Sequence, residues 1–115
     1  MKKSQQIIDM CQAIQNMLDK ELKDPRVNEP ALRRYAKAIK WFSENLSEYG
    51  DVDIDEPNKK LDFHTVMFVP HSDEFAFDGD YAKDFFTMCR EFDCANLTVF
   101  DEKPCIQLGI HIYSE

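Results

Sequence analysis

Four residues in the C-terminal third of the chain are of the types that bind zinc. Cys89, Cys94, Cys105 and His111 supply thiolate and imidazole donors, which zinc accepts in tetrahedral sites. Their spacing matches no zinc knuckle. Cys105 and His111 would also lie about 20 Å apart on one strand rising ~3.3 Å per residue, too far to share an ion. We therefore predict no metal site and no cofactor.

Two histidines are the residues best suited to acid–base chemistry near neutral pH. His64 and His111 are both expected on strands and on the more polar face of a sheet, where they would form a pair if the strands were neighbours. No nucleophile motif, glycine-rich phosphate loop or His-Glu-x-x-His motif accompanies them. We predict no catalytic residue and a protein that is not an enzyme; a small histidine-based or metal-dependent enzyme domain is the alternative.

Acidic residues are concentrated in the middle of the chain. Residues 44–84 hold twelve acidic and three basic side chains, whereas residues 1–43 hold five acidic and nine basic ones. Carboxylates around aromatic anchors suit a basic protein partner, because complementary charge speeds encounter while the aromatic residues supply affinity. The predicted partner-binding residues are Glu44, Glu48, Asp51, Asp53, Asp55, Glu56, Asp73, Glu74, Phe75, Phe77, Asp78 and Asp80.

Part of this acidic segment resembles a calcium loop in composition. Acids alternate from Asp51 to Asp55, but the central glycine and the closing glutamate of an EF-hand are missing. We therefore expect a solvated acidic loop over residues 50–60.

A basic surface is predicted on the second helix, formed by Arg33, Arg34, Lys37 and Lys40. Such a surface could contact phosphates, and nucleic-acid binding is an alternative function. The formal net charge of −8 disfavours direct binding to nucleic acid or to an anionic membrane. Self-association of the basic N-terminal part with the acidic middle is a further alternative.

The composition indicates one globular domain over residues 1–115. Hydrophobic residues make up 43% and charged residues 31%, with only 3 glycines. No apolar stretch approaches the roughly 20 residues that span a bilayer, and the first residues lack the apolar core of a secretory signal. We expect four reduced cysteines and a cytoplasmic protein.

Two amphipathic helices are predicted in the first half, over residues 4–22 and 28–49. Apolar residues recur at spacings of three and four in both. Asn28 suits the N-cap of the second helix, and Gly50 suits a left-handed residue after its end. The short connection between the helices predicts an antiparallel hairpin.

The second half predicts a β-α-β-β unit. Strands are expected over residues 61–69, 96–100 and 105–113, and a helix over residues 79–93. The predicted fold class is therefore α+β, with a helical hairpin followed by a three-stranded mixed sheet whose last strand is central.

These features together predict a small acidic protein that binds a macromolecular partner through a charged surface. The expected partner is a basic protein. Inhibitors, immunity-type proteins and nucleic-acid mimics share this charge distribution, so we expect a protein of one of these kinds, of bacterial or phage origin.

Overall fold

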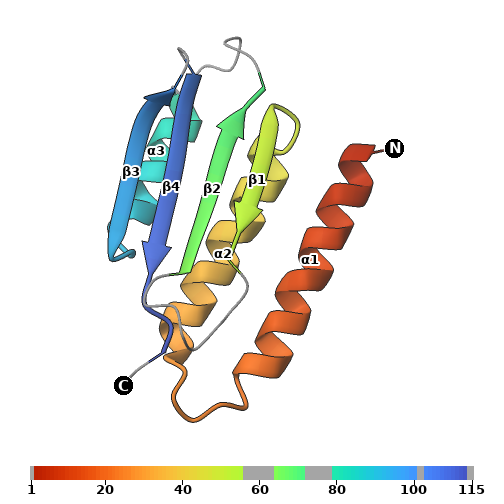
Figure 1. Ribbon diagram of the computed structural model, residues 1–115, viewed down its shortest axis with the longest axis vertical. Helices are drawn as coiled ribbons and strands as arrows, with labels where there is room; N and C mark the ends of the chain where they lie inside the picture. The colour runs from red at the N-terminus through yellow and green to blue at the C-terminus, as the bar shows by residue number, and fades with distance from the viewer. Residues whose placement is uncertain (1, 56–63, 72–78, 101–102, 114–115) are drawn as a thin grey trace.

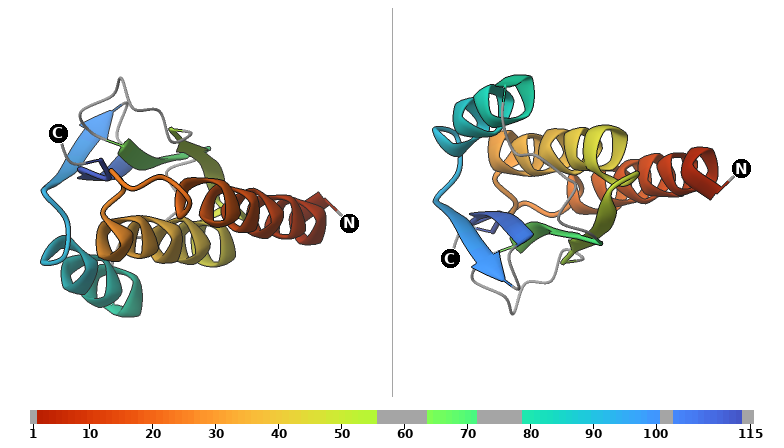
Figure 2. Two further views of the ribbon diagram at one scale, coloured as in Figure 1. Left: turned by 90° about the horizontal axis from the view of Figure 1, so that it is seen from below. Right: turned by 90° about the horizontal axis from the view of Figure 1, so that it is seen from above.

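A four-stranded sheet and three helices make up the computed structural model, which describes residues 2–55, 64–71, 79–100 and 103–113 (Figure 1). In chain order the elements are α1 (Lys2–Glu21), α2 (Glu29–Leu46), β1 (Gly50–Ile54), β2 (His64–Pro70), α3 (Gly79–Cys89), β3 (Cys94–Phe100) and β4 (Lys103–Ile110). The helices α2 and α3 lie on one side of the sheet, and α1 lies beside its β1 edge (Figure 2). This arrangement confirms the predicted α+β class.

The strand order in the sheet is β1-β2-β4-β3, and every neighbouring pair is antiparallel. The last strand lies between β2 and β3 and runs antiparallel to both, as predicted. The prediction of a three-stranded mixed sheet is wrong, because a fourth strand is present and no neighbouring pair is parallel.

The missed strand is β1, which the sequence analysis assigned to a loop. Aspartate is depleted in strands, so a run of alternating acids gave little β signal. At a sheet edge, however, one face can carry charge while the other packs inward. Asp51 and Asp53 are exposed on the outer face, and the half-buried Val52 and Ile54 pack against the core.

Packing of α2 on the sheet centre forms the core. Leu32, Tyr35, Ile39, Phe42 and Leu46 have no exposed surface, because the helical period places all five toward the strands. They meet the inward residues of β2 and β4, which include Val66, Phe68, Ile106 and Leu108. Each large apolar side chain buried in this way stabilises the fold by about 1.5–3 kcal/mol.

Local signals place the start of α2 well. The side chain of Asn28 accepts a hydrogen bond from the N–H of Ala31 at 3.2 Å, which confirms the predicted N-cap. The helix ends at Leu46, three residues before the predicted end. The third helix ends at Cys89 instead of residue 93, and β4 ends at Ile110 instead of residue 113.

The other two helices flank α2. The first helix runs antiparallel to α2 and lies beyond the β1 edge of the sheet, as Figures 1 and 2 show. It buries Met17, whereas Ile8 is 59% exposed. On the other flank, α3 buries Phe85 and Met88, and the indole N–H of Trp41 donates to the Asp84 carboxylate at 3.2 Å.

Gly50 was predicted to follow the end of α2 as a left-handed residue, and this prediction is wrong. Gly50 is instead the first residue of β1. A Cβ at this position would lie 2.7 Å from Cα of Pro70 and even closer to the carbonyl oxygen of Val69. The absence of a side chain therefore lets β1 approach β2. Gly79, by contrast, needs glycine because its φ is +54°, and a Cβ there would meet open space.

These two glycines give a stability prediction. Gly50→Ala should destabilise the fold by about 2–4 kcal/mol, because backbone atoms of β2 must move. Gly79→Ala should cost only about 1–2 kcal/mol, the price of a positive φ without a clash. Urea unfolding of both variants checks the order, and equal losses would contradict the proposed close approach at Gly50.

Candidate functional site

A groove runs between α1 and β1, with α2 as its floor. Its larger hollow has a volume of about 390 Å³ and is lined by Asp9 and Ala13 of α1, Ser43 and Ser47 of α2, and all of β1. A second hollow of about 230 Å³ shares Ala13 and Ile54 with the first. The larger volume lies in the usual range of ligand-binding pockets, roughly 300–1,000 Å³. We call the two hollows together the α1–β1 groove.

The groove is acidic at one end and apolar at the other. Asp9, Asp51 and Asp53 line its larger hollow, and all three are exposed. Ile14, Met17, Ile39 and Ile54 line the smaller one, together with polar residues of α1 that include Lys20 and Glu21. An apolar floor beside a carboxylate rim suits a ligand that is both basic and apolar.

The closed end of the groove is held by a contact between distant parts of the chain. The hydroxyl of Tyr113 donates a hydrogen bond to the carboxylate of Glu21, which is buried. Burial and the neighbouring Glu21 carboxylate raise the pKa of Tyr113 above its ordinary value, so the hydroxyl remains a donor at neutral pH. This bond ties the C-terminal end of α1 to the segment after β4.

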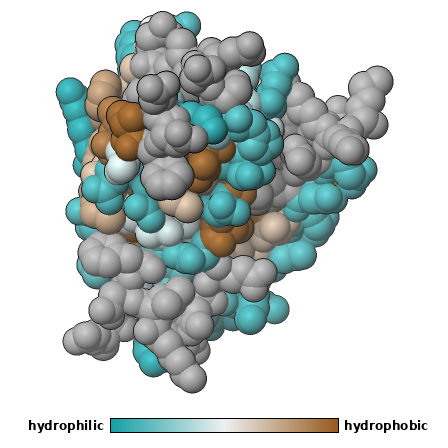
Figure 3. All heavy atoms as spheres, turned by 45° about the horizontal axis from the view of Figure 1, so that its top comes forward, coloured by the Kyte–Doolittle hydropathy of each residue, from teal (hydrophilic) through white to brown (hydrophobic). Residues whose placement is uncertain are grey.

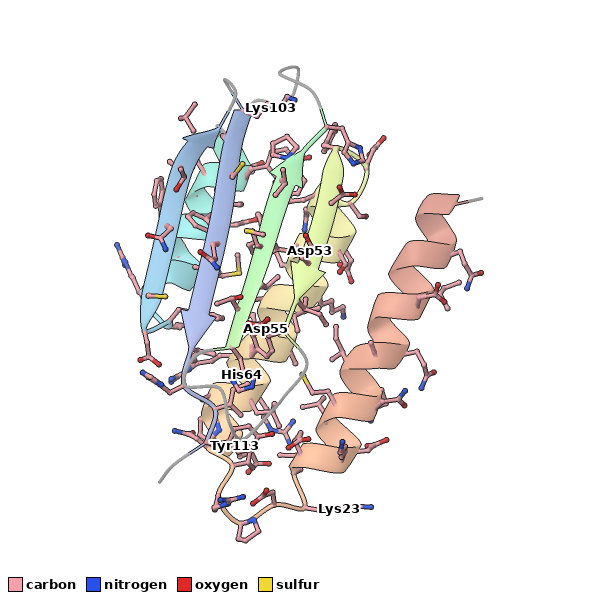
Figure 4. The ribbon with its side chains drawn as sticks, in the orientation of Figure 1. Lys23, Asp53, Asp55, His64, Lys103 and Tyr113 are labelled. Carbon is pink, nitrogen blue, oxygen red and sulfur yellow. The ribbon has the colours of Figure 1, made fainter. Side chains whose placement is uncertain are left out.

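Two of the predicted acids, Asp51 and Asp53, are exposed on β1. Asp53 is exposed on β1 (Figure 4), and its carboxylate forms no hydrogen bond or ion pair with the described residues. Asp51 is also exposed and lies 3.0 Å from the imidazole Nε2 of His71. Both carboxylates can therefore meet a partner at the rim of the groove.

Asp55 has an internal role instead. Its carboxylate accepts hydrogen bonds from the N–H and the hydroxyl of Thr65 at 3.1 and 2.9 Å. Next to it, the hydroxyl of Tyr35 lies 2.7 Å from the carbonyl oxygens of both Asp55 and Thr65, and burial raises the pKa of Tyr35 above its ordinary value. These bonds fasten the end of β1 to β2, so the carboxylate of Asp55 has a structural role.

The remaining predicted acids are spread over other surfaces. Glu44 is exposed on α2, Glu48 is exposed in the turn that follows α2, and Asp80 is exposed in the first turn of α3. The structure does not bring these three to the groove. The other predicted positions, Glu56, Asp73, Glu74, Phe75, Phe77 and Asp78, lie outside the described residues.

The predicted basic surface shares the outer face of α2 with acids. Arg33, Arg34, Lys37 and Lys40 are all exposed. However, Arg33 forms an ion pair with Glu29 at 2.9 Å and Lys40 forms one with Glu44 at 3.8 Å. These acids reduce the net positive charge that a nucleic-acid backbone would meet.

The prediction that His64 and His111 share the polar sheet face is wrong. His64 is paired with Ile110 on the inward face and is completely buried, with its ring near those of Tyr35 and Tyr113. His111 follows β4, is exposed, and its N–H donates to the Asp93 carboxylate at 2.7 Å. Because His111 follows the inward-facing Ile110, its side chain points to the other side of the sheet from His64. The two imidazoles therefore form no acid–base pair.

The cysteines show no reactive arrangement either. Among the described side chains, Cys89, Cys94 and Cys105 form no disulfide bond, and no three histidine, cysteine or acidic residues are grouped for a metal ion. Burial raises the pKa of the Cys89 thiol, which disfavours the nucleophilic thiolate.

A second exposed edge of the sheet lies on β3. Its seven residues carry no charge, and Leu97 and Val99 are 51% and 72% exposed although Leu97 shares the inward face with Ile106. In the space-filling view, apolar residues reach the surface as patches bordered by hydrophilic ones (Figure 3). The two sheet edges thus differ in charge: β1 is acidic and β3 is neutral.

No family model, curated protein sequence or solved structure matches the chain. Among the described residues, no helix has the length and apolar character required to cross a bilayer. The site must therefore be interpreted from its own geometry.

Sequence reasoning missed the contributions of α1 and α2 to the groove. Asp9 lies on α1 and Ser43 and Ile39 lie on α2, and no pattern in the sequence places them beside β1. The available signal was the alternation from Asp51 to Ile54, which is typical of a strand with one acidic face. That strand would have predicted an edge of the sheet. It would not have predicted that α1 lies beside this edge.

The contrast between Asp55 and Asp53 is testable. Asp55→Ala should lower the free energy of unfolding by about 1–3 kcal/mol, because the N–H of Thr65 loses its acceptor. Asp53→Ala should change it by less than about 0.5 kcal/mol, as expected for an exposed residue without a partner. Urea unfolding measures both, and a large loss in Asp53→Ala would assign that acid a structural role.

Proposed function

We propose that the protein is a non-enzymatic binding protein that captures a basic segment of a protein partner in the α1–β1 groove. The observation that carries the proposal is the groove itself, in which the acids Asp9, Asp51 and Asp53 adjoin an apolar floor. The groove therefore offers a basic partner complementary charge and an apolar surface that binding can bury.

The two parts of the groove have different roles in the proposed binding. Exposed ion pairs contribute only about 0.2–1 kcal/mol each, so the carboxylates mainly attract the partner and select basic residues. Burial of apolar groups against the half-buried Ile14 and Ile54 supplies the larger part of the affinity. A partner segment with lysines or arginines alone would accordingly bind more weakly than one that also carries apolar residues.

An enzymatic function receives less support from the described residues. His64 has no surface that a substrate could reach, and His111 lies apart from it. The lining residues include no histidine or cysteine, and the hydroxyls of Ser43 and Ser47 donate to the main-chain carbonyls of Ile39 and Ser43.

Selection from a random peptide library displayed on a solid support tests the proposal without knowledge of the natural partner. The enriched peptides should be rich in lysine and arginine interspersed with apolar residues, and their binding should weaken as salt is added. Enrichment of acidic or uncharged peptides, or binding that salt does not affect, would contradict the proposal.

Charge removal at the rim gives a quantitative prediction. The double variant Asp51→Asn/Asp53→Asn should lower the affinity for a selected basic peptide by about two- to thirtyfold, because two exposed ion pairs are lost. Fluorescence anisotropy of the labelled peptide measures the change.

The matched control is Glu44→Gln/Glu48→Gln. It removes the same amount of charge from α2 and the turn after it, where neither acid lines the groove. It should weaken binding much less than the β1 variant. Equal losses in the two variants would mean that net charge, and not the groove, governs binding.

A further inference from the structure

We infer that the partner segment binds by strand addition: it lies extended in the α1–β1 groove and pairs with the free main-chain edge of β1 as a fifth strand of the sheet. This inference rests on the function proposed above and specifies how the same groove recognises its ligand.

The hydrogen-bond phase of the β1–β2 ladder determines which main-chain groups face the groove. The N–H of His71 donates to the carbonyl of Tyr49 at 2.9 Å, and the N–H of Asp55 donates to the carbonyl of Thr65 at 3.0 Å. Bonded and non-bonded pairs alternate in an antiparallel ladder, so the odd-numbered residues of β1 bond to β2. The N–H and C=O groups of Val52 and Ile54 must therefore point away from β2.

These outward groups have no protein partner in the described part of the chain. No hydrogen bond is made to the main chain of Val52 or Ile54 from that side, and both residues line the groove. The neighbour across the groove is α1, whose own main-chain groups are used within the helix. An added strand can satisfy a sheet edge that a helix cannot.

The groove also specifies the side-chain pattern of the added strand. Side chains of neighbouring strands lie side by side on the same face of a sheet, and they alternate between faces along each strand. Residues that extend the outer face would lie beside Asp51 and Asp53, and basic side chains fit there. Residues between them would face the half-buried Ile14 of α1, where apolar side chains fit. The ligand is thus an extended segment in which basic and apolar residues alternate.

Charge argues against a second copy of the chain as the occupant. Pairing of β1 with another β1 would bring its two exposed aspartates next to the same acids of the partner copy, and like charges on adjacent strands are destabilising. The neutral edge strand β3 offers no basic residue to Asp51 or Asp53. A basic protein segment is the occupant that the groove favours.

Amide hydrogen exchange of the unmodified protein tests the inference directly. The probe is a capped synthetic peptide of alternating lysine and valine, and an otherwise identical peptide with glutamate in place of lysine is the control. On binding of the lysine peptide, exchange at the amides of Val52 and Ile54 should slow by about tenfold or more. The glutamate peptide should leave these amides unchanged.

A pair of variants isolates the main-chain contribution. Val52→Pro removes an N–H that faces the groove and leaves the bonds from β1 to β2 in place, since proline is tolerated at an edge strand. Val52→Ala trims the same side chain and keeps the N–H. The proline variant should bind the lysine peptide at least about fivefold more weakly than the alanine variant. If the proline variant does not fold, the exchange experiment on the unmodified protein decides.

The outcomes separate this inference from the proposed function. If the lysine peptide binds and Asp51→Asn/Asp53→Asn weakens it, but the amides of Val52 and Ile54 keep their exchange rates, strand addition is wrong and the acidic groove remains the binding site. Slowed exchange in β3 instead of β1 would overturn strand addition at this edge. Failure of every basic probe to bind would overturn both.

Discussion

The burial of one face of α2 against β2 and β4 is the constraint on which the rest of the structure depends. Tyr35, Phe42 and Leu46 are completely buried there, so α2 occupies the centre of the helical layer. The first helix can then pack only on the flank of α2, where it lies beyond the edge of the sheet (Figure 1). A helix in that place shields the edge without pairing with it, and the α1–β1 groove is the result.

The helices and the central position of the last strand could be predicted because each rests on a local pattern. Apolar spacing of three and four marks the helices, and Asn28 marks the start of α2. The strand β1 was missed because aspartate has a low strand propensity. Only the pairing of β1 with β2 makes the segment a strand. The burial of His64 was missed for a related reason: the outer and inner faces of β2 both carry apolar residues, so alternation does not distinguish them.

The sequence predicted that the candidate site is acidic, but it did not predict which residues form it. Acids that are close in the sequence separate in the structure into three groups: Asp51 and Asp53 at the groove rim, Glu44 and Glu48 on α2 and the turn after it, and Asp55, which bonds to Thr65. Asp9 joins the rim from the first helix, and only the packing of that helix brings it there. Local periodicity reports which face a residue occupies on its own element. It contains no information on which other element that face will meet.

The central claim is that the space between α1 and β1 is the binding surface of the protein. Mapping of backbone amide chemical shifts, recorded while a selected basic peptide is added to the isotope-labelled protein, tests it most directly. The account predicts that the largest changes fall on β1 and on the residues of α1 that face it, with small changes on α3 and β3. Changes centred on the outer face of α2 or on the β3 edge would contradict it.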